Sequence, residues 1–193
     1  FKRGLLLGHS DGASIATIYA GSIQDHRIRG LVLIAPHFFV EDVSIASIAE
    51  AKTAYAQTDL RAKLARWHKD PDNAFRGWND AWLDPQFRDW DIVQELAYIR
   101  VPILIVQGAD DQYGTARQIE AAQEECYCPV EVALLSGAKH SPHREAGADA
   151  GDWPKPINLF RGLAAPPLTP ADAPRVIGEY ADAFARAGGF DVT

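Results

Sequence analysis

Uninterrupted runs of apolar residues recur along the chain and predict the strands of a parallel sheet. Strands that are buried on both faces carry such runs, whereas half-exposed strands alternate apolar and polar residues. The first run is therefore expected to be a fully buried strand. Each run ends at a glycine, a proline or a polar loop, and the four predicted strands are residues 4–8, 29–35, 101–107 and 130–135.

Segments with apolar residues at helical spacing separate these runs. Residues 11–22 are expected to form a helix of mostly small side chains, and residues 116–125 a helix that begins after Thr115. Strand, helix and strand in this order imply parallel pairing through right-handed crossovers. The pattern predicts an α/β protein with a mostly parallel sheet flanked by helices.

The stretch between the second and third predicted strands has no strand pattern. Apolar residues recur at helical spacing over residues 45–67, the segment around Asp70 and Pro71 interrupts the run, and the pattern resumes over residues 74–83. We expect this helical insertion to form a cap on the sheet.

The pattern divides the chain into a core of residues 1–36 and 99–145 and a helical cap of residues 37–98. From residue 146 onward prolines crowd the sequence, and residues 146–193 are expected to form a C-terminal tail with one helix at residues 173–187. The chain contains no methionine. A translated chain starts with that residue, so we expect the sequence to begin inside a longer protein.

Composition excludes several classes of partner. The net charge of −7 argues against a nucleic acid or an anionic membrane surface. No apolar run approaches the ~20 residues that a membrane helix needs. The two cysteines, Cys126 and Cys128, are too close together for an unstrained disulfide and too few for a metal site without other ligands. We interpret them as reduced thiols of a cytoplasmic protein.

A G-x-S-x-G motif lies between the first predicted strand and the first helix. Gly8 and Gly12 flank Ser10 and lack side chains where backbones are expected to approach closely. The hydroxyl of Ser10 would then leave the carboxyl edge of the sheet at the positive end of the following helix. The alternative is a plain Gly-Ser turn of an α/β protein.

Three polar positions follow three separate predicted strands: Ser10, the pair Asp110 and Asp111, and His140. The carboxyl ends of parallel strands face a common crevice, so these side chains are expected to meet. A histidine that accepts the serine proton and a carboxylate that orients the histidine make serine a nucleophile. A zinc site of His140, His143 and an aspartate is an alternative, but no metal-binding motif accompanies these residues.

The motif around Ser10 and the residues after the later strands make the chain resemble enzymes of the α/β-hydrolase fold that carry a helical cap. It is similar to the bacterial esterase and meta-cleavage-product hydrolase branch. The resemblance covers about residues 4–145. The residues that carry it are the three strand-end segments Gly-His-Ser-Asp-Gly at 8–12, Gly-Ala-Asp-Asp at 108–111 and Gly-Ala-Lys-His at 137–140.

The resemblance implies a role for each residue. Ser10 is the nucleophile, His140 the general base and acid, and Asp111 rather than Asp110 the orienting carboxylate. The backbone N–H of Asp11 is implied to donate to the oxyanion. The resemblance implies neither a cofactor nor a metal.

Further residues are candidates for contact with the substrate. His37 follows the second strand, and Trp78 and Trp82 lie in the cap, where they could line an apolar pocket. Packing in the core is the alternative for all three. His9 inside the motif is expected to pack rather than react, and His143 to lie at the surface or behind His140.

The resemblance also implies that strands and a second oxyanion donor lie upstream of residue 1. The sequence therefore predicts a serine hydrolase for a small ester, thioester or C–C-linked acyl substrate. One alternative is a catalytically incomplete fragment or interaction module, completed by a second copy of the chain or by another segment that pairs with residues 4–8. A cofactor-free haloperoxidase or perhydrolase activity would use the same residues.

Overall fold

The computed structural model describes residues 2–145, and the predicted C-terminal tail lies outside them. Four strands form one sheet in the order β1-β2-β3-β4, and every neighbouring pair is parallel. This confirms the predicted α/β class with its parallel sheet. The strands are β1 (Gly4–His9), β2 (Ile28–Ile34), β3 (Ile103–Gly108) and β4 (Val130–Leu135).

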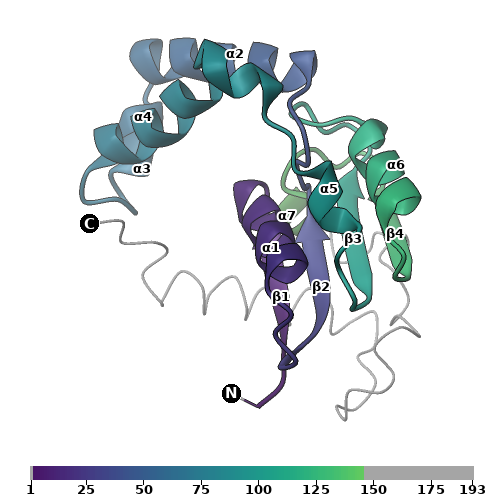
Figure 1. Cartoon of the computed structure of the whole chain (residues 1–193). Coiled ribbons are helices and arrows are strands. Elements are labelled where there is room, and N and C mark those ends of the chain that lie inside the picture. The colour runs from purple at the N-terminus through teal and green to yellow at the C-terminus, as the bar shows by residue number, and fades with distance from the viewer. Residues whose placement is uncertain (1, 146–193) are drawn as a thin grey trace.

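Helices α1 (Asp11–Ser22), α5 (Val93–Leu96) and α6 (Ala116–Glu125) cover one face of the sheet (Figure 1). The helix α6 begins after Thr115, whose hydroxyl accepts the N–H of Arg117 and so caps it. The short helix α7 (Pro142–Glu145) closes the described part of the chain. No helix within residues 2–145 is long and apolar enough to cross a membrane.

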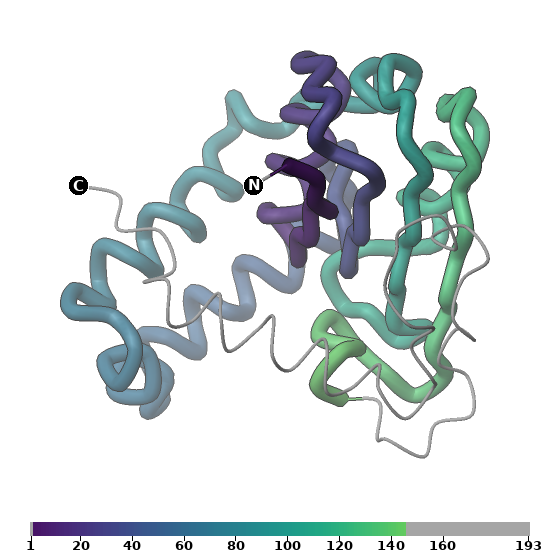
Figure 2. Tube along the Cα trace, turned by 90° about the horizontal axis from the view of Figure 1, so that it is seen from below, coloured from purple at the N-terminus to yellow at the C-terminus, as the bar shows by residue number. Residues whose placement is uncertain are grey.

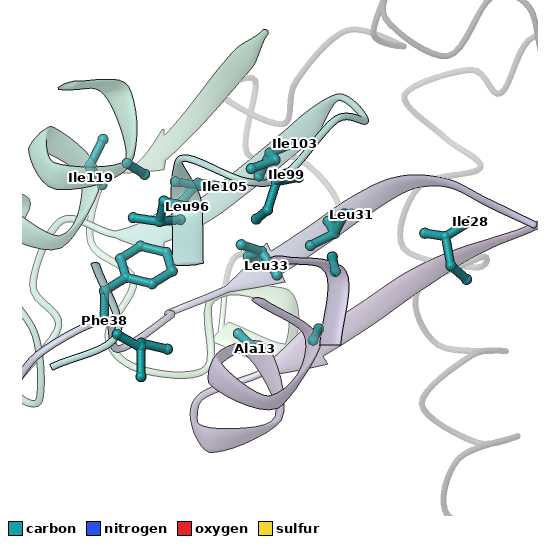
Figure 3. Close-up of a cluster of buried hydrophobic side chains, with 14 residues drawn as sticks. Ala13, Ile28, Leu31, Leu33, Phe38, Leu96, Ile99, Ile103, Ile105 and Ile119 are labelled. Atoms are coloured by element: carbon teal, nitrogen blue, oxygen red, sulfur yellow. The ribbon is translucent and has the colours of Figure 1, made fainter. Parts of the chain in front are cut away.

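The main core lies between the sheet and these three helices. Small side chains on α1, such as Ala13, let the helix pack closely on the strands. Figure 3 shows the branched side chains of β2 and β3 meeting those of the segment around α5. The labelled members of this cluster are Ala13, Ile28, Leu31, Leu33, Phe38, Leu96, Ile99, Ile103, Ile105 and Ile119.

The segment between β2 and β3 leaves the sheet at its carboxyl end. It contains α2 (Asp42–Gln57), α3 (Leu60–Leu64), α4 (Pro71–Trp82) and the 3-10 turn η1 (Pro85–Asp89). Figures 1 and 2 show α2, α3 and α4 extending beyond the strands on the β1 side. The outgoing and returning chains pair at a bridge between Phe39 and Asp91.

Two local expectations differ from the structure. The break expected around Asp70 and Pro71 does separate α3 from α4, but α4 begins at Pro71 rather than at residue 74, because Asp70 accepts the N–H of Asn73 as N-cap and proline fits the first helical turn. The strand β1 is not fully buried, since Leu5 is 42% and Leu7 39% exposed. Their side chains lie on the face away from α1, which no described helix covers at this strand.

Candidate active site

The turn between β1 and α1 presents Ser10 in a strained backbone conformation. Its φ of 55° and ψ of −125° lie outside the regions that L-residues ordinarily occupy. The Ser10 N–H donates to the Ile34 carbonyl of β2 at 2.9 Å, and its carbonyl accepts the N–H of Ala13 at 2.8 Å. A serine before a helix usually caps it, but the Ser10 hydroxyl makes no capping bond. The hydroxyl is thus available to another partner.

The two glycines of the motif have different roles. A Cβ on Gly8 would lie 2.2 Å from the Gly12 carbonyl oxygen, so β1 and α1 approach as closely as expected. A Cβ on Gly12 would meet no described atom within 4 Å. The expectation that Gly12 also lacks a side chain for steric reasons is therefore wrong. The Gly12 backbone contributes the atoms that Gly8 approaches, but a side chain on Gly12 would not enter this contact.

The loop after β3 places the Asp111 carboxylate within reach of several hydrogen-bond donors. The Asp111 side chain is 1% exposed, and the N–H of Tyr113 donates to its Oδ1 at 2.8 Å. The Gln107 amide donates to its Oδ2 at 2.6 Å. Burial alone would raise the pKa of Asp111, but the hydrogen bond and charge of His140 outweigh it and lower that pKa. The neighbouring Asp110 is exposed, and it is Asp111 rather than Asp110 that bonds to His140.

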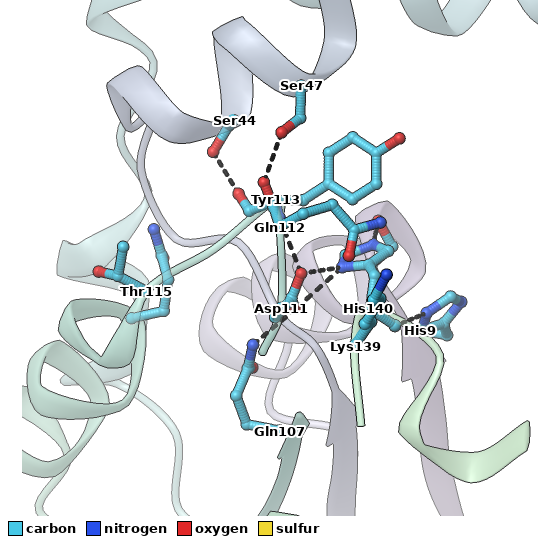
Figure 4. A network of polar contacts seen from close by, with 12 residues as sticks. His9, Ser44, Ser47, Gln107, Asp111, Gln112, Tyr113, Thr115, Lys139 and His140 are labelled. Carbon is cyan, nitrogen blue, oxygen red and sulfur yellow. Dashed lines mark hydrogen bonds and ion pairs between the residues drawn. The ribbon is translucent and has the colours of Figure 1, made fainter. Parts of the chain in front are cut away.

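The loop after β4 brings His140 against both groups. Its Nδ1 lies 2.9 Å from Asp111 Oδ1 and 3.0 Å from Oδ2, as the dashed lines of Figure 4 show. Its Nε2 lies 2.9 Å from Ser10 Oγ. An ionised carboxylate can only accept, so Nδ1 carries the proton and Nε2 is free to accept the serine O–H. The structure thus brings Ser10, His140 and Asp111 into one hydrogen-bonded series.

Close contact between two loops makes this series geometrically feasible. A Cβ on Gly108 would lie 2.1 Å from the Lys139 carbonyl oxygen, so only glycine allows the Asp111 loop to run beside the His140 loop. The Asp110 N–H donates to the Ala138 carbonyl at 2.9 Å and joins the two loops. The helix α2 holds the first loop from above: Ser44 and Ser47 donate to the carbonyls of Tyr113 and Gln112 (Figure 4).

Two further histidines lie beside the series: His9 contacts His140, and His143 contacts His9. His9 Nε2 donates to the His140 carbonyl at 2.8 Å, and its ring lies 5.1 Å from the His140 ring. The half-buried His143 ring lies 4.9 Å from that of His9. Burial lowers the pKa of His143 to about 4 and, against the bond to the carbonyl, lowers that of His9 as well. His9 packs, as expected, and also holds the backbone of His140.

A cavity of about 210 Å³ opens beside Ser10. His37, Trp78 and Trp82 all line it, so these three side chains lie where the sequence placed them as candidates for substrate contact. His37 is 3% exposed, and burial lowers its pKa to about 4. Trp82 is 4% exposed and packs edge-on against His37 at 5.1 Å, so it also belongs to the packing beneath α4.

Three residues of the site were not predicted from the sequence: Gln107, Ile48 and Tyr113. Gln107 is a polar residue in an otherwise apolar strand, a signal that a buried partner exists. Ile48 and Tyr113 line the cavity. In the sequence, Ile48 is marked only by its helical spacing, and Tyr113 only by its place in the loop next to Asp111. Neither pattern predicts contact with a cavity. Within residues 2–145 no group of three or more histidine, cysteine or acidic side chains is arranged to hold a metal ion.

Comparisons with known proteins support the fold described above. A family model described as the alpha/beta hydrolase family matches residues 1–153. A search of the curated proteins finds no match. The match covers more than half of the chain and includes all of the residues that the structure describes.

Solved structures with a similar fold include three bacterial and archaeal proteins. A carboxylesterase structure from the thaumarchaeon Nitrososphaera gargenis has a TM-score of 0.55 at 14% identity, over 99% of this chain and 67% of that one. The esterase RhEst1 from Rhodococcus sp. ECU1013 has a TM-score of 0.50 at 16% identity, over 97% of this chain and 67% of that one. A bromoperoxidase from Bacillus anthracis has a TM-score of 0.50 at 20% identity, over 74% of this chain and 62% of that one. This chain thus spans less than two thirds of the bromoperoxidase, and identities this low concern the fold alone.

Proposed function

Because this chain belongs to the alpha/beta hydrolase family, we propose that it is a serine hydrolase that cleaves a small ester, thioester or C–C-linked acyl substrate. The observation that carries the proposal is the hydrogen-bonded series of Ser10 Oγ, His140 Nε2 and Nδ1, and Asp111. A serine hydroxyl is a weak nucleophile at neutral pH, and this arrangement supplies the base that it needs.

In the first step Ser10 Oγ attacks the acyl carbon while His140 Nε2 takes the hydroxyl proton. The imidazolium that forms is stabilised by Asp111, which also keeps the imidazole in the tautomer with a free Nε2. The resting distance of 2.9 Å between Oγ and Nε2 is within the range for direct proton transfer. His140 then returns the proton to the leaving group, and a water molecule activated by the same imidazole releases the acyl group from Ser10.

The developing oxyanion needs donors, and the backbone N–H of Asp11 is the candidate. The helix α1 begins at Asp11, so this N–H belongs to the first turn, whose N–H groups have no partner within the helix. The positive end of the helix dipole favours negative charge at the same place. Removal of one such donor typically lowers kcat by a factor of ~10²–10³. We assign a contribution of this size to the Asp11 N–H.

The cavity limits the substrate to a small one. At about 210 Å³ it accommodates a short acyl or alcohol group, and its walls are largely aromatic and aliphatic. The helices α2 and α4 contribute Ile48, Trp78 and Trp82 to these walls. We propose that the helical segment acts as a cap that shapes the pocket and limits the access of water.

A second candidate is a catalytically incomplete part of such a hydrolase. It is favoured by the share of the bromoperoxidase that the chain spans, 62%, and by the exposed Leu5 and Leu7 of β1. Another segment or a second copy of the chain would then complete the sheet along β1. Ester turnover by the monomeric chain would exclude this candidate.

The test is steady-state hydrolysis of short-chain p-nitrophenyl esters by the full chain. We expect turnover in the wild-type chain and a loss of at least about a thousandfold in kcat for Ser10→Ala. The matched control is Ser136→Ala, because Ser136 is an exposed serine in the loop after β4. Turnover that survives in Ser10→Ala would refute the proposal.

A further inference from the structure

Negative and positive side chains are not balanced in the lining of the cavity beside Ser10. Among the described residues that line it, Asp11 carries the one carboxylate, and none is a lysine or an arginine. His9 and His37 do not compensate for it, because burial lowers the pKa of both and that of His37 to about 4. When Asp11 is ionised, the lining residues therefore leave an excess negative charge next to the nucleophile.

The position of the Asp11 carboxylate is determined by the helical segment above it. Trp82 Nε1 donates to Asp11 Oδ1 at 3.2 Å and to Oδ2 at 3.3 Å. No ion pair of Asp11 is formed within residues 2–145. Burial raises the pKa of Asp11, and the bond from Trp82 opposes that rise. In its ionised form this carboxylate is only weakly hydrated, because the group is partly buried.

Aromatic rings also line the same cavity. Trp78 and Trp82 are four residues apart on α4 and so lie on one face of that helix. Trp78 and Tyr113 meet edge to face, with ring centroids 6.3 Å apart. Aromatic faces attract cations, above all alkylated ammonium groups that carry little hydration. A carboxylate and three aromatic rings around one small space make a site for such a group.

We infer that the cavity selects esters that carry a positively charged alkylammonium group and disfavours esters that carry a carboxylate, with the Asp11 side chain as the specificity-determining residue. The inference rests on the proposed serine hydrolase function. Asp11 would then serve twice: its backbone N–H faces the oxyanion, and its side chain sets the charge of the substrate that binds.

The substitution Asp11→Asn isolates the charge. The amide oxygen of asparagine can still accept the Trp82 N–H, and the backbone N–H at this position is kept. A change in charge preference therefore reports the lost carboxylate rather than a lost contact. The matched control is Asp110→Asn, which removes an exposed carboxylate from the loop after β3 without altering the lining of the cavity.

The first experiment compares three acetate esters of similar shape at an alkaline pH, which favours the ionised form of Asp11. They are acetylcholine, its neutral analogue with carbon in place of nitrogen, and that analogue with a carboxylate in place of one methyl group. We expect kcat/KM of the wild-type chain to be about thirtyfold higher for the cationic than for the anionic ester. In Asp11→Asn the ratio should fall to about threefold or less, and in Asp110→Asn it should stay at the wild-type value. Equal rates for the two charged esters, or an unchanged ratio in Asp11→Asn, would overturn the inference.

A second experiment measures binding without hydrolysis. Choline and its neutral carbon analogue are titrated into the Ser10→Ala chain, and the tryptophan fluorescence is followed. Tighter binding of choline that disappears in the Ser10→Ala, Asp11→Asn chain supports the charge preference even if no ester is hydrolysed, in which case the proposed function alone fails. Ser10-dependent hydrolysis of the neutral ester with equal binding of both ligands refutes the charge preference and leaves the proposed function intact.

Discussion

Alanine at Gly8 and alanine at Gly12 should have opposite effects, although the two glycines belong to one motif. A Cβ on Gly8 would lie 2.2 Å from the Gly12 oxygen, 2.4 Å from the Gly12 carbon and 2.5 Å from the Ala13 nitrogen. These are backbone atoms, and real Cβ atoms do not approach such atoms closer than 3.0 Å. In Gly8→Ala the helix α1 must therefore move away from β1 by most of an ångström.

The surroundings of each Cβ position set the size of the two effects. Overpacking of this kind lowers the free energy of unfolding by about 1–3 kcal/mol. A shift of about 1 Å in a reacting group lowers the rate roughly a hundredfold, and Ser10 moves with the start of α1. Gly12 has open space around its Cβ position and lies in the helix, so Gly12→Ala should raise the free energy of unfolding by about 0.5–1 kcal/mol.

The assay is urea unfolding combined with hydrolysis of p-nitrophenyl acetate by both variants. We expect Gly8→Ala to lose stability and about a hundredfold in kcat. We expect Gly12→Ala to gain stability and to keep kcat within about threefold. Equal losses in the two variants would refute the reasoning, because the motif alone would then matter and the close approach of β1 to the Gly12 backbone would not.

Three other contacts allow shorter tests. Gln107→Leu should lower kcat about tenfold by removing the donor to Asp111, with little change in denaturant stability, because the Gln107 Oε1 is already buried without a partner. Asn79→Ala should lower the free energy of unfolding by about 1–3 kcal/mol in a thermal melt, since the buried Asn79 amide donates to the Ile48 carbonyl at 2.8 Å; an unchanged melting temperature would contradict this. The pKa of His37 is 6.5 in the unfolded chain and about 4 in the folded one, so the unfolded chain binds more protons between these values and stability falls as the pH falls. This contribution amounts to about 3 kcal/mol at most. The free energy of unfolding, measured at several pH values across that range, should therefore change less with pH in His37→Gln than in the wild-type chain.

Much of the architecture was predictable because buried parallel strands and packed helices leave strong local patterns. The helices α1 and α6 begin and end where the apolar spacing and the Thr115 cap indicated. The meeting of Ser10, Asp111 and His140 could also be anticipated, since parallel strands end at one edge of a sheet. The choice of Asp111 over Asp110 came from a family resemblance, and the geometry brings Asp111 to His140.

Features that depend on distant partners were not predictable. An apolar run does not say which face of a strand a helix will cover, so the exposure of Leu5 and Leu7 was missed. The bond from His9 to the His140 carbonyl joins residues 131 positions apart, and no local pattern marks it. The separate roles of Gly8 and Gly12 follow from the direction of approach of two backbones, which a motif does not encode.

The most direct test of the account is to find which residue reacts with a fluorophosphonate. The full chain is treated with the reagent, digested, and the labelled peptide is identified by mass spectrometry. We predict one adduct, on Ser10, that does not form in Ser10→Ala and forms at least a hundredfold more slowly in His140→Gln. An adduct on another residue, or equal labelling of the wild-type and Ser10→Ala chains, would contradict the assignment of Ser10 as a nucleophile activated by His140.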